Sequence, residues 1–142
     1  GYNIQKLISQ LQEILNLKTP HNIALVGVGN LGSALLNYPS FTRYGMKITA
    51  AFDNDKSRIG KIQNGIQIRD ISEAETLERE DIRLAILAVP TQQAQSVTDM
   101  LVGAGIEGII NFTSNYLAVP SGVKIISIDI SIDMARLPYY LT

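Results

Sequence analysis

Apolar residues follow two different patterns along the chain. In residues 2–16 they recur at helical spacing, with Gln, Lys and Glu between them, at Ile4, Leu7, Ile8, Leu11, Ile14 and Leu15. This pattern predicts an amphipathic helix over 2–16, and Pro20 prevents that helix from continuing. Two interpretations are open: the helix covers the core that follows, or it connects that core to an upstream domain.

From residue 23 onward, continuous apolar runs alternate with polar segments. The runs predict strands buried on both faces over 23–28, 46–53, 84–89, 108–112 and 124–129, with a short strand at 66–68. Helices are predicted over 31–38, from a Ser72–Glu75 capping box, from a Thr91 cap to Val102, and over 132–141, whereas 55–65 is polar and turn-rich. This alternation predicts an α/β fold with a Rossmann-like, doubly wound, mainly parallel sheet and helices on both faces.

Three glycines lie between the first predicted strand and the helix after it. Gly27, Gly29 and Gly32 have the spacing G-x-G-x-x-G. In this fold the first glycine permits a tight turn, the second lets the backbone approach a pyrophosphate, and the third allows close packing of helix on strand. The pyrophosphate then meets the free N–H groups of Asn30, Leu31 and their neighbours at the helix N-terminus. The pattern therefore predicts a dinucleotide site.

Asp53 ends the next predicted strand, about 20 residues beyond Gly32. Its carboxylate can accept hydrogen bonds from both hydroxyls of an adenosine ribose and repels a 2′-phosphate, so NAD is favoured over NADP. Val89 and Pro90 follow a central strand at its carboxyl end. They form an apolar wall beside the ligand, or they only end the strand.

Charge and composition exclude several classes of protein. The 142 residues carry 12 Lys and Arg against 13 Asp and Glu, for a net charge of -1, which does not fit a nucleic-acid-binding domain. Without cysteine there is no thiol nucleophile and no thiolate zinc site, and no metal site is predicted. No apolar run approaches the ~18 residues of a membrane span, and the first residues do not resemble a signal peptide. We expect a soluble, cytoplasmic domain.

The chain contains few side chains suited to acid–base or nucleophilic catalysis. The single histidine, His21, precedes the first predicted strand, at the end of the sheet opposite the glycine turn. Tyr38, Asn111 and Asp129 are the conspicuous polar residues near the predicted nicotinamide end, and none forms an acid–base pair by itself. We therefore predict that the chain is not an enzyme. Two alternatives stay open: the cofactor domain of an NAD-dependent dehydrogenase, and a coenzyme A-binding domain, since related sheets also carry GVGNLG.

Four stretches resemble the redox-sensing transcriptional repressor family Rex: "GVGNLGSALLNY", "AFDNDKSRIGK", "ILAVPTQQAQSVTDMLVGAGIEGIINF" and "VPSGVKIISIDI". The resemblance covers nearly the whole chain. It implies a homodimer that binds NADH and NAD, in which NADH favours an arrangement that releases operator DNA. It also implies that 1–19 is a linker helix from a winged-helix domain missing here. Residues 20–128 would then be the NAD(H)-binding domain, and 129–142 a C-terminal helix exchanged between subunits.

The resemblance also assigns roles to residues by position. The pyrophosphate would be held by Gly27, Gly29, Asn30, Leu31 and Gly32, and the adenosine ribose by Asp53. Val89 and Pro90 would line the adenine side and Asn111 and Phe112 the nicotinamide half, while Tyr38 and Asp129 match switch positions. The chain departs from the family at Ser114, where many members have proline, and at Ile130, where an aromatic residue is common.

Overall fold

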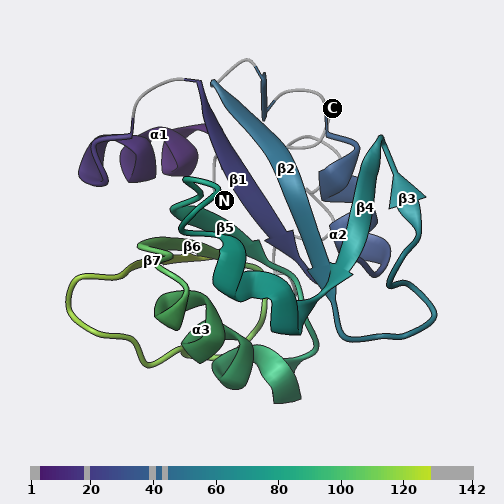
Figure 1. The fold of residues 1–142 in the computed structure, drawn as a ribbon. Helices are drawn as coiled ribbons and strands as arrows, with labels where there is room; N and C mark the ends of the chain where they lie inside the picture. The colour runs from purple at the N-terminus through teal and green to yellow at the C-terminus, as the bar shows by residue number, and fades with distance from the viewer. Residues whose placement is uncertain (1–3, 18–19, 39–40, 43–44, 129–142) are drawn as a thin grey trace.

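The fold is built on a seven-stranded sheet with the order β3-β4-β2-β1-β5-β6-β7 (Figure 1). The computed structural model describes residues 4–17, 20–38, 41–42 and 45–128. The strands are β1 (His21–Val26), β2 (Met46–Asp53), β3 (Ile62–Gln63), β4 (Ile66–Asp70), β5 (Leu84–Leu87), β6 (Gly108–Asn111) and β7 (Lys124–Ser127). Every pairing is parallel except that of β3 with β4. The six parallel strands have the Rossmann order, so the predicted fold class is confirmed.

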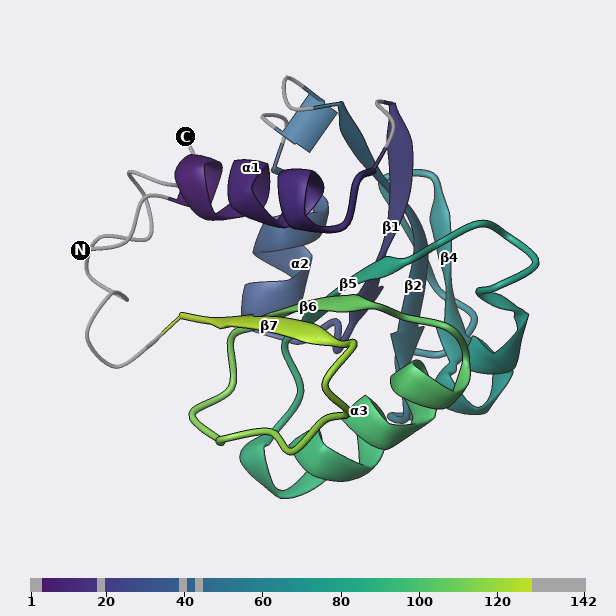
Figure 2. The same ribbon diagram turned by 90° about the vertical axis from the view of Figure 1, so that its left-hand side faces the viewer.

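Helical segments cover both faces of the sheet (Figure 2). One face carries α1 (Ile4–Ile14) and α2 (Asn30–Leu36); the other carries α3 (Ala94–Gly103) and the short 3-10 segments η2 (Ile71–Thr76) and η3 (Thr91–Gln93). Alternate residues of β1 therefore enter different cores. Ile23 and Leu25 pack in the core that includes Leu11 of α1, whereas Val26 packs in the core of α3. Both cores need apolar side chains, which explains the continuous apolar strands.

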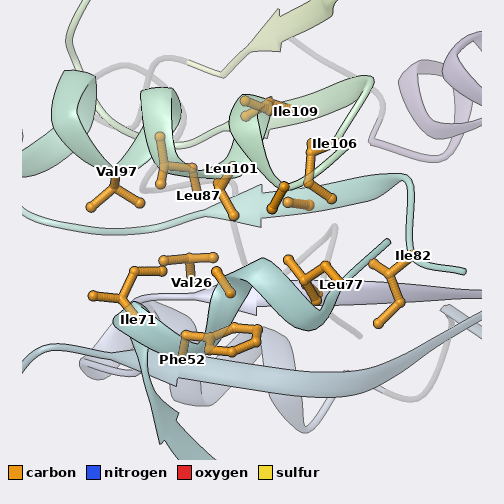
Figure 3. Packing of buried hydrophobic residues seen from close by; sticks show 14 of the residues in the cluster. Val26, Phe52, Ile71, Leu77, Ile82, Leu87, Val97, Leu101, Ile106 and Ile109 are labelled. Atoms are coloured by element: carbon orange, nitrogen blue, oxygen red, sulfur yellow. The ribbon is translucent and has the colours of Figure 1, made fainter. Parts of the chain in front are cut away.

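The core on the α3 face is shown in Figure 3. Val97 and Leu101 of α3 lie over Val26 and Phe52 of the central strands, and Leu77 fills the space beside them. Each of these side chains is 5% exposed or less. The core fixes the segments that leave β2 and β5 at their carboxyl ends.

Two predicted helix caps are wrong. The segment after β4 is capped by Asp70, whose side chain accepts a hydrogen bond from the Ser72 N–H (3.0 Å), while the Glu73 carboxylate accepts one from the Asp70 N–H (3.2 Å). The capping box thus begins two residues before Ser72, because β4 ends directly at Asp70. Thr91 does not cap the next segment either: Pro90 is its N-cap, and no side chain bonds there.

The strand β3 was not predicted, because 55–65 appeared to be turn throughout. Asn64 and Gly65 both have positive φ angles, 51° and 77°, and form the two-residue turn between β3 and β4. Asn-Gly is the usual sequence of such hairpin turns because both residues tolerate positive φ. The signal was present in the sequence, but only two residues on each side pair.

The first helix belongs to the packed body of the described residues. Leu11 has no exposed surface, and a Cβ at Gly108 would lie 2.6 Å from a methyl carbon of Leu15. The Arg83 guanidinium donates to the Leu15 carbonyl (3.1 Å) at the end of the helix and pairs with Glu107. The structure therefore shows that this helix covers the core, which was one of the two interpretations of its sequence. The helix predicted over 132–141 lies outside the described residues.

Candidate functional site

A cleft of about 710 Å³ opens at the carboxyl ends of the central strands. It lies where the strand order reverses, between β1 and β5, the place where open α/β sheets bind ligands. Most of the predicted site residues line it, namely Gly27, Gly29, Asn30, Leu31, Asp53, Val89, Pro90 and Phe112.

The glycine turn forms the floor of the cleft. Gly27 has a φ of +95°, and a Cβ there would lie 2.5 Å from the Ala88 carbonyl oxygen. A Cβ at Gly32 would lie 1.9 Å from the Gly27 carbonyl oxygen, so only glycine lets α2 begin this close to β1. Gly32 thus lies behind the turn and does not line the cleft. Asn30 and Leu31, which line the cleft, begin α2, and their N–H groups have no intrahelical partner.

Asp53 ties the end of β2 to this turn. Its side chain is 6% exposed and accepts hydrogen bonds from the Val28 N–H (2.8 Å) and the Asp55 N–H (2.9 Å). The Arg58 guanidinium lies 3.3 Å from the same oxygen that Val28 binds. A carboxylate has about four acceptor positions, so one remains on the oxygen that faces Asp55. Asp53 can accept a hydroxyl without giving up the contacts that hold it.

The residues after Asp53 form a charged rim. Asp55 accepts hydrogen bonds from the Ser57 hydroxyl (2.7 Å) and N–H (2.9 Å), and these bonds, with the nearby Arg58, lower the pKa of the Asp55 carboxyl below its ordinary value. Asn54 donates to the Gln93 side chain (2.8 Å), which joins the segment after β2 to the segment after β5.

Two walls of the cleft are apolar. Val89 and Pro90 continue from β5, and Phe112 follows β6. Hydrogen bonds from the Ala88 N–H to the Val26 carbonyl (2.8 Å) and from the Phe112 N–H to the Leu87 carbonyl (2.9 Å) extend the ladder past the strand ends. Both apolar walls are therefore fixed to the sheet.

Comparison with known proteins decides the family. The family model of the CoA binding domain matches residues 18–115. The redox-sensing transcriptional repressor Rex of Syntrophobacter fumaroxidans is 40% identical over all of this chain and 69% of its own length. The chain belongs to the Rex family of redox-sensing transcriptional repressors. The Rex of Roseiflexus sp. is 42% identical over 99% of this chain, which spans 64% of that relative's length.

Solved structures support the same family assignment. The crystal structure of RSP, a Rex-family repressor, is 34% identical with a TM-score of 0.78, and the match covers 99% of this chain and 68% of RSP. RSP has also been solved with NADH, and with NAD+ and operator DNA. UDP-D-quinovosamine 4-dehydrogenase from Vibrio fischeri is only 19% identical with a TM-score of 0.58, so it shares the fold alone. The Rex relatives are repressors, not enzymes, which agrees with the predicted lack of catalysis.

Asn111 is the predicted Rex site residue that the structure places differently. It has no exposed surface and does not line the cleft. Its amide donates to the Asn115 carbonyl (3.0 Å) and the Ser127 hydroxyl (3.2 Å) and accepts from the Thr113 N–H (2.9 Å) and hydroxyl (2.6 Å). These bonds use the whole amide to hold the loop after β6. Asn111 thus holds the loop that follows Phe112, and its part in binding the nicotinamide stays a prediction.

Of the two residues that the resemblance assigns to the switch, Tyr38 does not line the cleft. Tyr38 lines a separate cavity of about 610 Å³ between the end of α2 and the outer part of the sheet, with its ring edge-on to Phe41 at 4.9 Å. Asp129 lies outside the described residues, as does the rest of 129–142. His21 begins β1 at the end of the sheet opposite the cleft, as the sequence predicts.

Arg58 is a charged residue of the cleft that sequence reasoning missed. It lines the cleft, and its signal was a cation five residues after the strand-end acid, in a segment that we interpreted only as a turn. Among the described residues, no group of three His, Cys, Asp or Glu side chains lies close enough to hold a metal ion. Within the same residues, every helix is too short or too polar to cross a membrane.

Proposed function

We propose that this chain is the NAD(H)-sensing domain of a redox-responsive repressor, in which NADH binding relieves DNA binding by the full-length dimer. The observation that carries the proposal is the glycine turn facing Asp53, with one acceptor position free, in a member of the Rex family. RSP, which is similar over 99% of this chain, has been solved with both NADH and NAD+.

The cleft suggests a direction for the dinucleotide. The pyrophosphate lies over the turn after Gly29, near the free N–H groups of Asn30 and Leu31. The adenosine ribose bonds to Asp53, and the adenine lies against Val89 and Pro90. The nicotinamide then reaches the end near Phe112, because Phe112 follows β6 on the other side of the switch point from β2.

The charge distribution supports selectivity for NADH. The titratable side chains among the described lining residues are Asp53, Asp55 and Arg58, which all belong to the adenosine end. The oxidised nicotinamide is positively charged, and the described lining residues at the Phe112 end offer no carboxylate to compensate the loss of its hydration. The reduced ring is neutral and avoids this cost. A ligand shifts a two-state equilibrium only by its differential affinity, so this difference at one ring is what a sensor needs.

The remaining parts of the proposal rest on the resemblance to Rex. The full-length protein is a cytoplasmic homodimer whose residues 129–142 exchange between subunits and whose winged-helix domain binds operator DNA. Tyr38 and Asp129 take part in the switch between the cofactor states. The helix α1 joins the two domains, and its packing against the sheet makes it move with the NAD(H) domain.

Isothermal titration calorimetry with NADH, NAD+ and coenzyme A tests the proposal. We expect binding of both dinucleotides, with NADH clearly tighter, and no binding of coenzyme A. Equal affinities for NADH and NAD+ would contradict a redox sensor. Binding of coenzyme A alone would select the function named by the domain model.

A further inference from the structure

Among the described residues that line the cleft, one cationic side chain is available to the phosphates of a dinucleotide. The described lining residues include two carboxylates, Asp53 and Asp55, and one cation, Arg58. A pyrophosphate brings two further negative charges. Without Arg58, the adenosine end of the cleft would combine anionic protein groups with an anionic ligand, which is unfavourable at short range.

The guanidinium lies directly beside the glycine turn. Its two terminal nitrogens are 3.9 and 4.0 Å from the position that a Cβ of Gly29 would occupy. Because Gly29 has no Cβ, the protein backbone can approach a pyrophosphate at this point. Arg58 is therefore within reach of a phosphate oxygen seated on the turn, and its side chain is 42% exposed and accessible from the cleft.

The surrounding chain holds Arg58 in this place. Its N–H donates to the Asp55 carbonyl (2.9 Å), and the Asp55 carboxylate accepts from Ser57, which closes the turn that carries the arginine. The guanidinium is 3.3 Å from the Asp53 carboxylate and 3.8 Å from that of Asp55. A planar, permanently charged group with several donors can keep these contacts and still donate to a phosphate.

We propose that Arg58 is a further binding residue of this site, and that its guanidinium binds the phosphate groups of the dinucleotide. The inference rests on the proposed function and adds one element to it. Arg58 contributes affinity that NADH and NAD+ share, and it does not contribute to the distinction between them, because the nicotinamide lies at the other end of the cleft.

A purely structural role for Arg58 predicts the opposite change in nucleotide affinity when the arginine is removed. If Arg58 served only as an ion-pair partner of Asp53, it would occupy an acceptor position that a second ribose hydroxyl could use, and its removal would free that position. Binding would then become tighter. The direction of the change therefore separates the two roles.

The test compares Arg58→Gln, Arg58→Lys and the matched control Lys61→Gln. Lys61 is an exposed cation three residues away that does not line the cleft, so its substitution makes the same change in net charge. Calorimetry gives the affinities for NADH, NAD+ and ADP-ribose, and an NMR titration gives that for adenosine, which has no phosphate.

We expect Arg58→Gln to weaken NADH, NAD+ and ADP-ribose by the same factor, about tenfold, the size of one charge-assisted hydrogen bond. Adenosine binding stays unchanged, Arg58→Lys retains part of the affinity, and Lys61→Gln equals the parent. The inference fails if Arg58→Gln binds dinucleotides as well as or better than the parent, or loses adenosine equally. A parent chain that binds none of the nucleotides contradicts the proposed function itself.

Discussion

Replacement of Gly32 by alanine is the sharpest test of the geometry of the turn. The added Cβ would lie 1.9 Å from the Gly27 carbonyl oxygen and 2.9 Å from its carbon, whereas ordinary contact begins at 3.4 Å. The obstacle is backbone, so no side chain can rotate away. The helix α2 and the strand β1 must separate by about 1.5 Å to restore contact.

The energetic cost follows from this displacement. Overpacking of a fitted core costs about 1–3 kcal/mol, and the gain in helix propensity from glycine to alanine offsets about 1 kcal/mol. Because the clash involves two main-chain segments, we expect the upper end of that range, a net loss of about 2 kcal/mol. For a domain of this size, that loss lowers the melting temperature by about 8 °C.

Differential scanning calorimetry measures the effect, and Gly103→Ala is the matched control. Gly103 ends α3, and no atom lies within 4 Å of its built Cβ, so alanine there should leave the melting temperature unchanged or raise it. Gly32→Ala should also weaken NADH binding more than its stability loss explains, because the N–H groups of α2 move. A Gly32→Ala protein that melts at the parent temperature would refute this account of the turn.

Three further predictions concern other parts of the molecule. Asp53→Ala should weaken NADH and NAD+ alike, by about tenfold in calorimetry, because the ribose loses its acceptor. Leu11→Ala should cost about 2–5 kcal/mol in urea unfolding, whereas Ile14→Ala, at a side chain 57% exposed, should cost far less. Asp55 contributes stability above its ordinary pKa of 3.8 that is lost as the pH falls through its lowered pKa. In an NMR titration, Ser57→Ala should therefore raise the Asp55 pKa toward 3.8.

Much of the fold could be predicted because a doubly wound sheet imposes strong patterns. Strands buried on both faces must be continuously apolar, and 46–53 was predicted with the bounds that β2 has in the structure. The glycine turn was also predictable. At Gly27 and Gly32 any side chain would collide with backbone atoms, so the fold requires glycine at both positions.

The caps and the small hairpin were less predictable. Asp70–Glu73 and Ser72–Glu75 both have the spacing of a capping box, and only the point where β4 ends selects the first. The two-residue strand β3 exists because it pairs with β4, which depends on the chain that follows it. The Asn64-Gly65 turn is visible in the sequence, but neither the end of β4 nor the two-residue length of β3 can be inferred from it.

A site residue could be predicted where its place at the end of a strand determines whether it faces the cleft. It could not be predicted where the side chain is oriented by its hydrogen-bond partners. The residues directly after the central strands face the cleft, so Asp53, Val89 and Pro90 could be placed from strand ends alone. Asn111 occupies an equivalent place but turns its amide toward Ser127 and the loop after β6. Arg58 reaches the cleft from a turn whose course the sequence did not reveal.

A crystal structure of the chain with NADH tests the central claim most directly. The account predicts an adenosine ribose hydroxyl within hydrogen-bonding distance of the Asp53 carboxylate and the pyrophosphate on the turn after Gly29. It also predicts the nicotinamide beside Phe112. A dinucleotide bound elsewhere, or bound with its nicotinamide at Asp53, would contradict it.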